Sequence, residues 1–200
     1  MGSRRLAARR RRGAMLLGAA ALAILAIVLA MPLARKAVND LALPLQHADI
    51  IRQQATQKRL DPALIAAVIY AETKFDPRPS PAGAQGLMQI LPQTADFLAR
   101  RSGARTFTTA DLATPQVNIS YGSYYLRYLL DEYSGNTTLA VAAYNGGESN
   151  VGRWLARAHA HGQPLTVAAI PFAETRAYVL KVLRAQQDYR RTYASELGYG

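Results

Sequence analysis

Apolar residues recur every three or four positions along most of the chain after Gln46, which is the spacing of helices that bury one face. Typical runs are Ile50, Ile51 and Ala55, followed by Leu64, Ile65, Val68 and Ile69. The alternation of apolar and polar residues that marks strands is nearly absent. The pattern therefore predicts an all-α domain.

Local signals place the ends of the predicted helices. Asp61 followed by Pro62 predicts a helix start, because an Asp side chain accepts hydrogen bonds from free amides and proline suits the first helical position. Thr114 is the predicted cap of a later helix. Three prolines and a glycine between Lys74 and Ala84 predict an irregular loop. Further helices are predicted over residues 92–101, 115–133, 137–143, 148–160 and 173–193.

An uncharged run of 22 residues, 13–34, consists mainly of Ala, Leu, Ile and Val. As a helix it is long enough to cross the roughly 30 Å hydrocarbon core of a bilayer. Six arginines precede it and only Arg35 and Lys36 follow closely, so the positive-inside rule places the N-terminus in the cytoplasm and the rest of the chain outside. The alternative is a cleaved signal peptide, since small residues occur near Ala30 and Ala34, although the run exceeds the usual apolar region of about 7 to 15 residues.

These signals divide the chain into five predicted segments. They are a basic cytoplasmic N-terminus (1–12), a transmembrane signal-anchor (13–34), a linker (35–45), a globular domain (46–193) and a C-terminal tail (194–200). The linker is bounded by Pro32 and Pro44 and lacks a sustained apolar period.

The formal net charge of +11 is concentrated near the N-terminus. After Lys36, 16 basic and 13 acidic residues leave the rest of the chain with a net charge of only +3. Nucleic-acid binding is therefore not expected, because the arginines adjoin the predicted membrane segment instead of forming a basic face on the domain. The chain has no cysteine, so neither a disulfide nor a lipid-bearing cysteine contributes to it.

Glu72 ends the apolar stretch 64–71 and is the first candidate for chemistry. A carboxyl group at the edge of a core is desolvated, which raises its pKa and suits a general acid. Taken alone, the residue is better explained as an exposed glutamate at a helix end. Glycosidases usually pair two carboxylates. Asp76 is the nearest second candidate, but its place in the proline-rich loop favours a turn-forming role.

Four sequence blocks give Glu72 its context, and in their order they resemble the Slt-type soluble lytic transglycosylases. The first is Glu72-Thr73-Lys74-Phe75, then Ser80, then Gly83-Ala84-Gln85-Gly86-Leu87-Met88-Gln89 with Pro92 and Thr94-Ala95. The others are Asn118-Ile119 with Tyr121-Gly122 and Tyr125-Leu126, then Ala143-Tyr144-Asn145-Gly146-Gly147, then Ile170-Pro171 with Glu174-Thr175-Arg176 and Tyr178-Val179. The resemblance covers roughly residues 46–193.

The resemblance implies a goose-type lysozyme-like domain whose groove binds peptidoglycan strands of alternating N-acetylglucosamine and N-acetylmuramic acid. Glu72 matches the catalytic glutamate, which protonates the glycosidic oxygen and then, as a base, takes the proton of the muramoyl C6 hydroxyl to close a 1,6-anhydro ring. No metal or cofactor is expected. The implied location is the periplasmic face of the bacterial inner membrane, and the sequence does not identify a partner in the envelope machinery.

Several groove residues carry over by position. For Tyr144 a core aromatic is the alternative, but the Asn-Gly-Gly that follows predicts a turn where its hydroxyl reaches solvent or ligand. Met88 fits the core and the groove equally well. The substrate-binding residues that the resemblance implies are Ser80, Gln89, Tyr144, Asn145 and Glu174.

The chain departs from the common family pattern at three positions. Thr73 stands where serine is usual, Leu91 where methionine is frequent and Gly146 where alanine is usual. Thr73 keeps a hydroxyl and is expected to orient Glu72. The alternatives to a lytic transglycosylase are a non-catalytic peptidoglycan-binding scaffold and a hydrolytic lysozyme, in which water attacks in place of the C6 hydroxyl.

Overall fold

The computed structural model describes residues 27–31, 42–78 and 80–199. The chain divides into two compact units, Met1–Ala42 and Leu43–Gly200. In the first unit, residues 27–31 are helical and expose large apolar side chains such as Ile27 and Leu29. Most of the predicted span 13–34 lies outside the described residues. None of the helices in the described part of the chain is both long and apolar enough to cross a bilayer.

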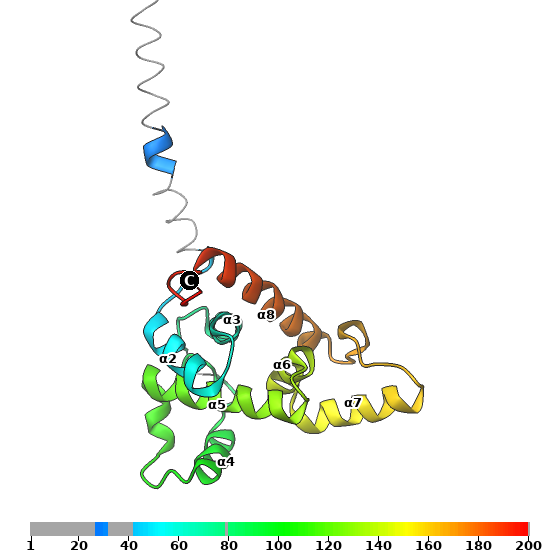
Figure 1. The fold of residues 1–200 in the computed structure, drawn as a ribbon. Helices are drawn as coiled ribbons and strands as arrows, with labels where there is room; N and C mark the ends of the chain where they lie inside the picture. Colours follow the sequence, from blue (N-terminus) through cyan, green and yellow to red (C-terminus); the bar gives the residue numbers. More distant parts are fainter. Residues whose placement is uncertain (1–26, 32–41, 79, 200) are drawn as a thin grey trace, which may run out of the picture. The chain divides into compact units, whose positions relative to one another are not determined.

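The second unit is helical throughout its described residues, where the only strand-like feature is an isolated bridge between Gln85 and Ile90 (Figure 1). Its α-helices are α2 (Ala48–Lys58), α3 (Pro62–Thr73), α4 (Pro92–Ser102), α5 (Pro115–Glu132), α6 (Thr137–Gly146), α7 (Glu148–Ala160) and α8 (Ala173–Thr192). Two short 3₁₀ helices, η1 (Thr109–Ala113) and η2 (Val167–Ala169), were not predicted.

The predicted helices are present, with small changes at their ends. Helix α7 matches its predicted range, and α4, α5 and α8 differ from theirs by one residue at the C-terminal end. Helix α6 is three residues longer than predicted and includes Tyr144, so the predicted turn at Tyr144 is wrong. Thr114 occupies the N-cap of α5, but its side chain makes no capping hydrogen bond.

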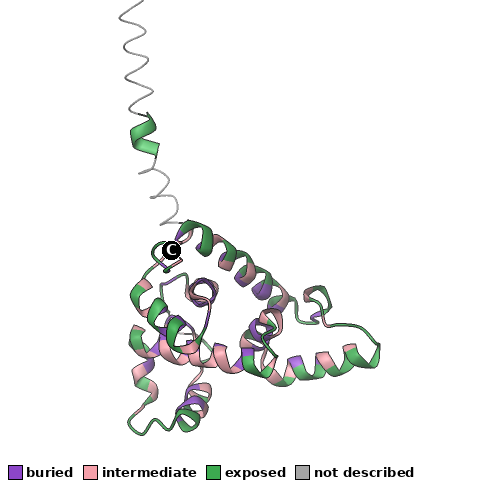
Figure 2. Cartoon of the chain, in the orientation of Figure 1, coloured by how far each residue is buried: buried purple, intermediate pink, exposed green. Residues whose placement is uncertain are grey.

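Helix α3 is the centre of the domain. Asp61 accepts a hydrogen bond from the Ala63 amide at 3.0 Å and Pro62 occupies the first turn. Every residue from Ala63 to Ile69 is buried, as expected for a helix that is apolar on all sides. Its most extensive contacts are with α8, and α8 in turn packs against α6. Buried residues are dense along α3 and line one side of α8 (Figure 2).

The folded unit is longer at both ends than the predicted domain 46–193. At the N-terminal end, Leu43 and Leu45 pack against the core, and the Leu43 carbonyl accepts a hydrogen bond of 2.8 Å from the Tyr193 hydroxyl. At the C-terminal end, Leu197 is buried in the same core. Leu43 and Leu45 from the predicted linker and Leu197 from the predicted tail are therefore part of the domain.

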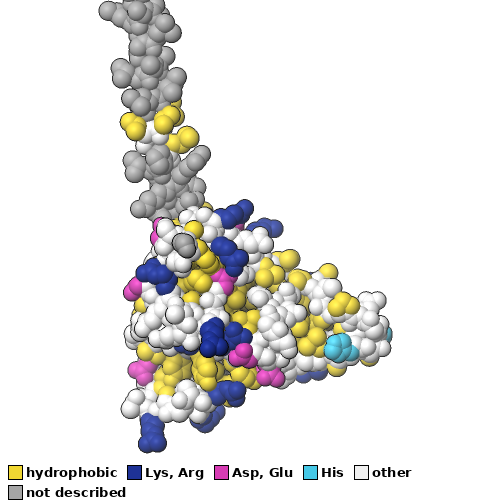
Figure 3. All heavy atoms as spheres, viewed as in Figure 1, with side chains coloured by type: hydrophobic (Ala, Val, Ile, Leu, Met, Phe, Trp, Pro, Cys, Tyr) yellow, Lys and Arg dark blue, Asp and Glu magenta, His cyan; other side chains and the backbone are white. Residues whose placement is uncertain are grey.

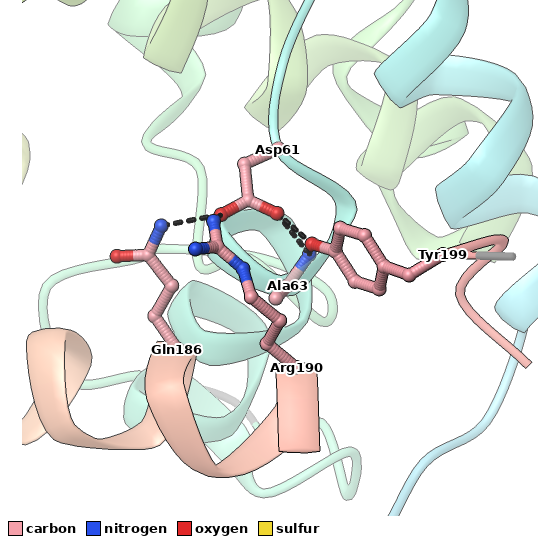
Figure 4. Close-up of polar contacts among 5 residues, drawn as sticks. All are labelled: Asp61, Ala63, Gln186, Arg190 and Tyr199. Carbon is pink, nitrogen blue, oxygen red and sulfur yellow. Dashed lines mark hydrogen bonds and ion pairs between the residues drawn. The ribbon is translucent and has the colours of Figure 1, made fainter. Parts of the chain in front are cut away.

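Asp61 joins three distant parts of the chain (Figure 4). Besides capping α3, its carboxylate accepts hydrogen bonds from Gln186 and Arg190 on α8 and from the hydroxyl of Tyr199 near the C-terminus. The Tyr199 hydroxyl also lies 3.1 Å from the Ala63 amide. This network holds the start of α3 against α8 and the C-terminal residues.

Charged side chains are mixed on the surface of this unit. In Figure 3, basic and acidic side chains are interspersed with apolar and uncharged ones, and no broad face of a single sign is visible. This distribution agrees with the small net charge that the sequence gives after Lys36.

Asp61→Ala should destabilise the domain by about 1–3 kcal/mol, because it removes a helix cap and leaves partly buried donors without an acceptor. Asp131→Ala is the matched control, since Asp131 forms an i,i+4 pair with Arg127 and its side chain is 69% exposed. It should cost no more than about 0.5 kcal/mol. Urea denaturation of both variants measures the difference, and equal losses would contradict the role given to Asp61.

Candidate active site

Glu72 lies in the last turn of α3, where the apolar helix reaches the surface of the domain. It borders a cavity of about 490 Å³, a volume within the usual range for ligand sites. The residues that line this cavity are Ala71, Glu72, Thr73, Lys74, Asp76, Arg78, Ser80, Pro81, Gln89 and Lys181. A second cavity of about 500 Å³ shares Arg78 and Ser80 with the first, so the two adjoin.

Burial raises the pKa of Glu72 to about 7, well above the ordinary value of 4.5. Two groups act in the opposite direction. The Tyr178 hydroxyl donates a hydrogen bond of 2.7 Å to Glu72 Oε1, and the positive charge of Lys181 favours the carboxylate. A pKa near neutrality suits a group that acts first as an acid and then as a base.

Tyr178 and Lys181 both come from α8, and neither was predicted as a site residue. Tyr178 is buried, so its hydroxyl needs a partner, and Glu72 provides one. The Lys181 ammonium donates to the Ala71 carbonyl at 2.7 Å and lies over the Tyr70 ring, 5.5 Å from its centre. The helical spacing of the two residues shows that they share a face of α8, but only the packing of α8 on α3 shows that this face meets Glu72.

Two of the predicted sugar-binding residues, Ser80 and Gln89, line the same cavity as Glu72. Ser80 lies in the proline-rich loop, where its hydroxyl oxygen accepts from the Ala82 amide at 3.2 Å. The Gln89 side-chain amide donates to the Gly86 carbonyl at 2.9 Å, which leaves its side-chain oxygen available to a ligand.

Thr73 and Tyr144 hold the turn before Gln89 in place. The Thr73 hydroxyl donates to the Leu87 carbonyl at 2.8 Å and not to Glu72 itself. The Tyr144 hydroxyl donates to the Met88 carbonyl, also at 2.8 Å. Burial and the nearby Glu72 charge raise the pKa of Tyr144 well above its ordinary value. Both residues therefore lie beside the acid and are bonded to the turn.

Met88 itself belongs to the core. Its side chain is fully buried, and a side-chain carbon added at Gly122 would lie 2.3 Å from the Met88 sulfur. The sequence allowed a position in the core or in the groove, and the structure supports the core position.

Asn118 is a buried polar residue that fixes the turn from Gln85 to Ile90. Its side-chain amide donates to the carbonyls of Gln85 and Leu112 at 2.8 and 3.0 Å, and its oxygen accepts from the Met88 amide at 2.8 Å. Gly86 has a φ of +72°, and an added side-chain carbon would lie 2.1 Å from the Asn118 side chain. Only glycine meets both requirements without displacing neighbouring groups.

Neither Asn145, which follows Tyr144 in α6, nor Glu174 lines the cavity that contains Glu72. The Asn145 side-chain oxygen accepts a hydrogen bond of 2.8 Å from Thr175, which joins the end of α6 to the start of α8. Glu174 is exposed in the first turn of α8.

Asp76 lines the cavity, but it is paired with a base. Its carboxylate lies 2.8 Å from the Arg78 guanidinium, and both side chains are mostly exposed. Its backbone amide donates to the Thr73 carbonyl at 3.0 Å. These contacts agree with a turn-forming residue.

Comparison with known families identifies the domain. Residues 49–165 match the model of the Transglycosylase SLT domain. The chain belongs to this family. The family resemblance that the sequence blocks predicted is therefore confirmed.

Relatives of this SLT chain include soluble and membrane-bound enzymes. The soluble lytic murein transglycosylase of Escherichia coli (strain K12) is 33% identical over 150 residues, which are 74% of this chain and 23% of the relative. The membrane-bound lytic murein transglycosylase C of Edwardsiella ictaluri is 31% identical over 170 residues, covering 73% of this chain and 47% of the relative. The chain thus spans about a quarter of the soluble relative and about half of the membrane-bound one.

Solved structures of similar SLT proteins share the fold. An inactive glutamate-to-glutamine mutant of lytic transglycosylase Slt from Pseudomonas aeruginosa aligns with a TM-score of 0.71 and 32% identity, covering 78% of this chain and 26% of that one. The complex of a 70-kDa soluble lytic transglycosylase with bulgecin A aligns with a TM-score of 0.71 and 31% identity, covering 77% of this chain and 25% of that one. The predicted lysozyme-like fold of these proteins is confirmed for residues 43–199.

Glu72→Gln should make the folded protein more stable than the wild type, and this difference should grow as the pH rises. Because the folded pKa of about 7 exceeds the ordinary value of 4.5, the folded state keeps a proton that the unfolded chain loses, and stability declines between these values. The difference corresponds to about 3 kcal/mol. Glutamine does not titrate, so the variant should gain about this much stability relative to wild type between about pH 4 and pH 8.

Urea denaturation at several pH values measures this gain. Glu174→Gln, an exposed glutamate outside the cavity, is the matched control and should show no comparable change with pH. A gain of the same size in both variants would mean that the carboxyl group of Glu72 is not specially desolvated.

Proposed function

We propose that this protein is a peptidoglycan lytic transglycosylase that cleaves the β-1,4 bond between N-acetylmuramic acid and N-acetylglucosamine and leaves 1,6-anhydromuramoyl products. The observation that carries the proposal is Glu72, a desolvated carboxyl group with a pKa of about 7 at the edge of a ligand-sized cavity. The family relationship supports the same reaction, because the relatives are named lytic murein transglycosylases.

The first step needs an acid. Protonated Glu72 donates its proton to the glycosidic oxygen as the bond to the muramoyl C1 breaks. Its high pKa keeps the proton available near neutral pH, and the surrounding apolar helix limits competing contact with water. The N-acetyl group of the substrate stabilises the cationic intermediate.

The second step needs a base. The Glu72 carboxylate accepts the proton of the muramoyl C6 hydroxyl, whose oxygen bonds to C1 and closes the anhydro ring. Tyr178 and Lys181 stabilise the carboxylate between the two steps, since both lower its pKa. The acid is restored at the end of the cycle without net consumption of water.

A single carboxyl group distinguishes this scheme from the usual glycosidase mechanisms, which need two. The cavity has one other carboxylate among its lining residues, Asp76. Its pairing with Arg78 on the exposed loop supports a structural role. We therefore assign no nucleophile or second base.

The remaining site residues have proposed roles around Glu72. Ser80 and Gln89 hydrogen-bond the sugars in the cavity, while Thr73 and Tyr144 position the turn that presents Gln89. Asn145 and Glu174 contact the strand farther from the reacting bond, near the junction of α6 and α8.

Glu72→Gln should reduce glycan cleavage by at least several hundredfold, because general acid and base steps each contribute about 100- to 10,000-fold. Mass spectrometry of products from purified sacculi measures the loss. Wild-type products should be lighter by one water than hydrolytic ones. Products with a reducing-end muramic acid would instead identify a hydrolytic lysozyme.

Asp76→Asn is the control for the single-carboxylate scheme. It should keep activity within about tenfold of wild type, since only an exposed ion pair is lost. A loss as large as that of Glu72→Gln would show that a second carboxylate takes part.

We further propose that residues 13–34 anchor the protein in the bacterial inner membrane, with residues 1–12 in the cytoplasm and the SLT domain in the periplasm. The flanked apolar run supports this placement, and one relative is named as membrane-bound. In this placement the domain faces the peptidoglycan, which is its proposed binding partner.

Cell fractionation should recover the full-length protein with the inner membrane, and protease added to spheroplasts should degrade the domain. The physical reason is that 22 uncharged residues are too apolar to leave the bilayer in a wash with high salt or alkali. A soluble periplasmic form with a new N-terminus near Ala34 or Ala37 would mean that the segment is a cleaved signal peptide.

A further inference from the structure

The cavity beside Glu72 carries an excess of positive charge. Lys74, Arg78 and Lys181 line it together with two acids, Glu72 and Asp76. Arg78 is neutralised by Asp76 at 2.8 Å. When Glu72 is protonated, as the first catalytic step requires, the ammonium groups of Lys74 and Lys181 remain without a matching negative charge in the cavity.

Lys181 is held in place at the cavity wall. Its ammonium donates one hydrogen bond to the Ala71 carbonyl at 2.7 Å and lies over the Tyr70 ring. An ammonium has three N–H donors, so two can still bind a ligand. The side chain is exposed, which gives a ligand access to them.

Lys74 lies at the C-cap of α3, two residues after Glu72, and it is exposed. It forms no ion pair with any residue between 42 and 199 that the structure describes. Its charge lowers the pKa of Lys181, after burial, the larger cause. The two ammonium groups are thus close enough to repel each other, and an anion bound between them would relieve that repulsion.

Lys181 also has a simpler explanation. A cation near the last carbonyls of a helix stabilises that helix, and the contact with Ala71 is of this kind. That role accounts for one hydrogen bond of Lys181, and it also favours Lys74, which stands at the C-cap of α3. It does not use the remaining N–H donors of the two ammonium groups, which both line the cavity.

We propose that Lys74 and Lys181 together bind a carboxylate carried by the glycan strand in the cavity, so that the enzyme selects anionic strands over neutral ones. This inference rests on the proposed function. The strand offers two sources of that chemistry, namely the lactyl carboxylate of a muramoyl residue without peptide and the carboxylates of an attached stem peptide. A polymer of N-acetylglucosamine alone offers neither.

Binding is measured by calorimetry with the full chain carrying Glu72→Gln, so that no strand is cleaved. The probes are a peptide-free muramoyl tetrasaccharide, the same tetrasaccharide with stem peptides, and a neutral tetramer of N-acetylglucosamine. Lys74→Met with Lys181→Met should weaken binding of an anionic probe about tenfold, the size expected for two partly exposed charge pairs. Binding of the neutral tetramer should change less than about twofold, and added salt should reduce the difference between anionic and neutral probes.

The matched control is Arg100→Met with Arg184→Met, which removes two positive charges from exposed positions outside the cavity. It should leave all three affinities unchanged. A loss confined to the peptide-bearing probe assigns the site to the stem, and one confined to the peptide-free probe assigns it to the lactyl group. Equal losses for the neutral tetramer, or no loss for any probe, would overturn the proposal, whereas absence of cleavage by the wild type would overturn only the proposed function.

Discussion

The packing of α8 on α3 determines the chemistry of this domain. Helix α3 is buried from Ala63 to Ile69, and the same packing excludes water from Glu72 at its last turn. Because α8 covers this part of α3, it also places the Tyr178 hydroxyl on the carboxyl group and the Lys181 ammonium on the neighbouring Ala71 carbonyl. The contact that stabilises the core is thus the one that sets the protonation of the acid.

A second constraint comes from buried polar groups. Apart from the bridge between Gln85 and Ile90, the turn that these residues bound has no helix or sheet to satisfy its backbone, so Asn118 on α5 supplies two hydrogen bonds, to the Gln85 carbonyl and from the Met88 amide. Thr73 and Tyr144 add two more. Leaving such groups unpaired costs about 1–3 kcal/mol each, so these hydrogen bonds stabilise the conformation of this short irregular segment next to the cavity.

The sequence predicts the helices well and the contacts between them poorly. Asp61 and Pro62 mark the start of α3 because capping is a local effect, and the prolines after Lys74 exclude a helix for the same reason. The contact of Tyr178 with Glu72 spans 106 residues and depends on how two helices pack, which apolar spacing does not specify. Tyr144 was misplaced because the glycines that follow it end α6 later than predicted.

One carboxyl group that acts as acid and then as base in the same cycle needs a pKa near the working pH. In the proposed mechanism, burial alone would hold the proton on Glu72 too firmly for the base step, because desolvation is the largest influence on its pKa and raises it. The Tyr178 hydrogen bond and the Lys181 charge both oppose that influence. A carboxyl group at the edge of the core, with one buried hydrogen-bond donor and one exposed cation beside it, has its pKa raised by burial and can still release its proton.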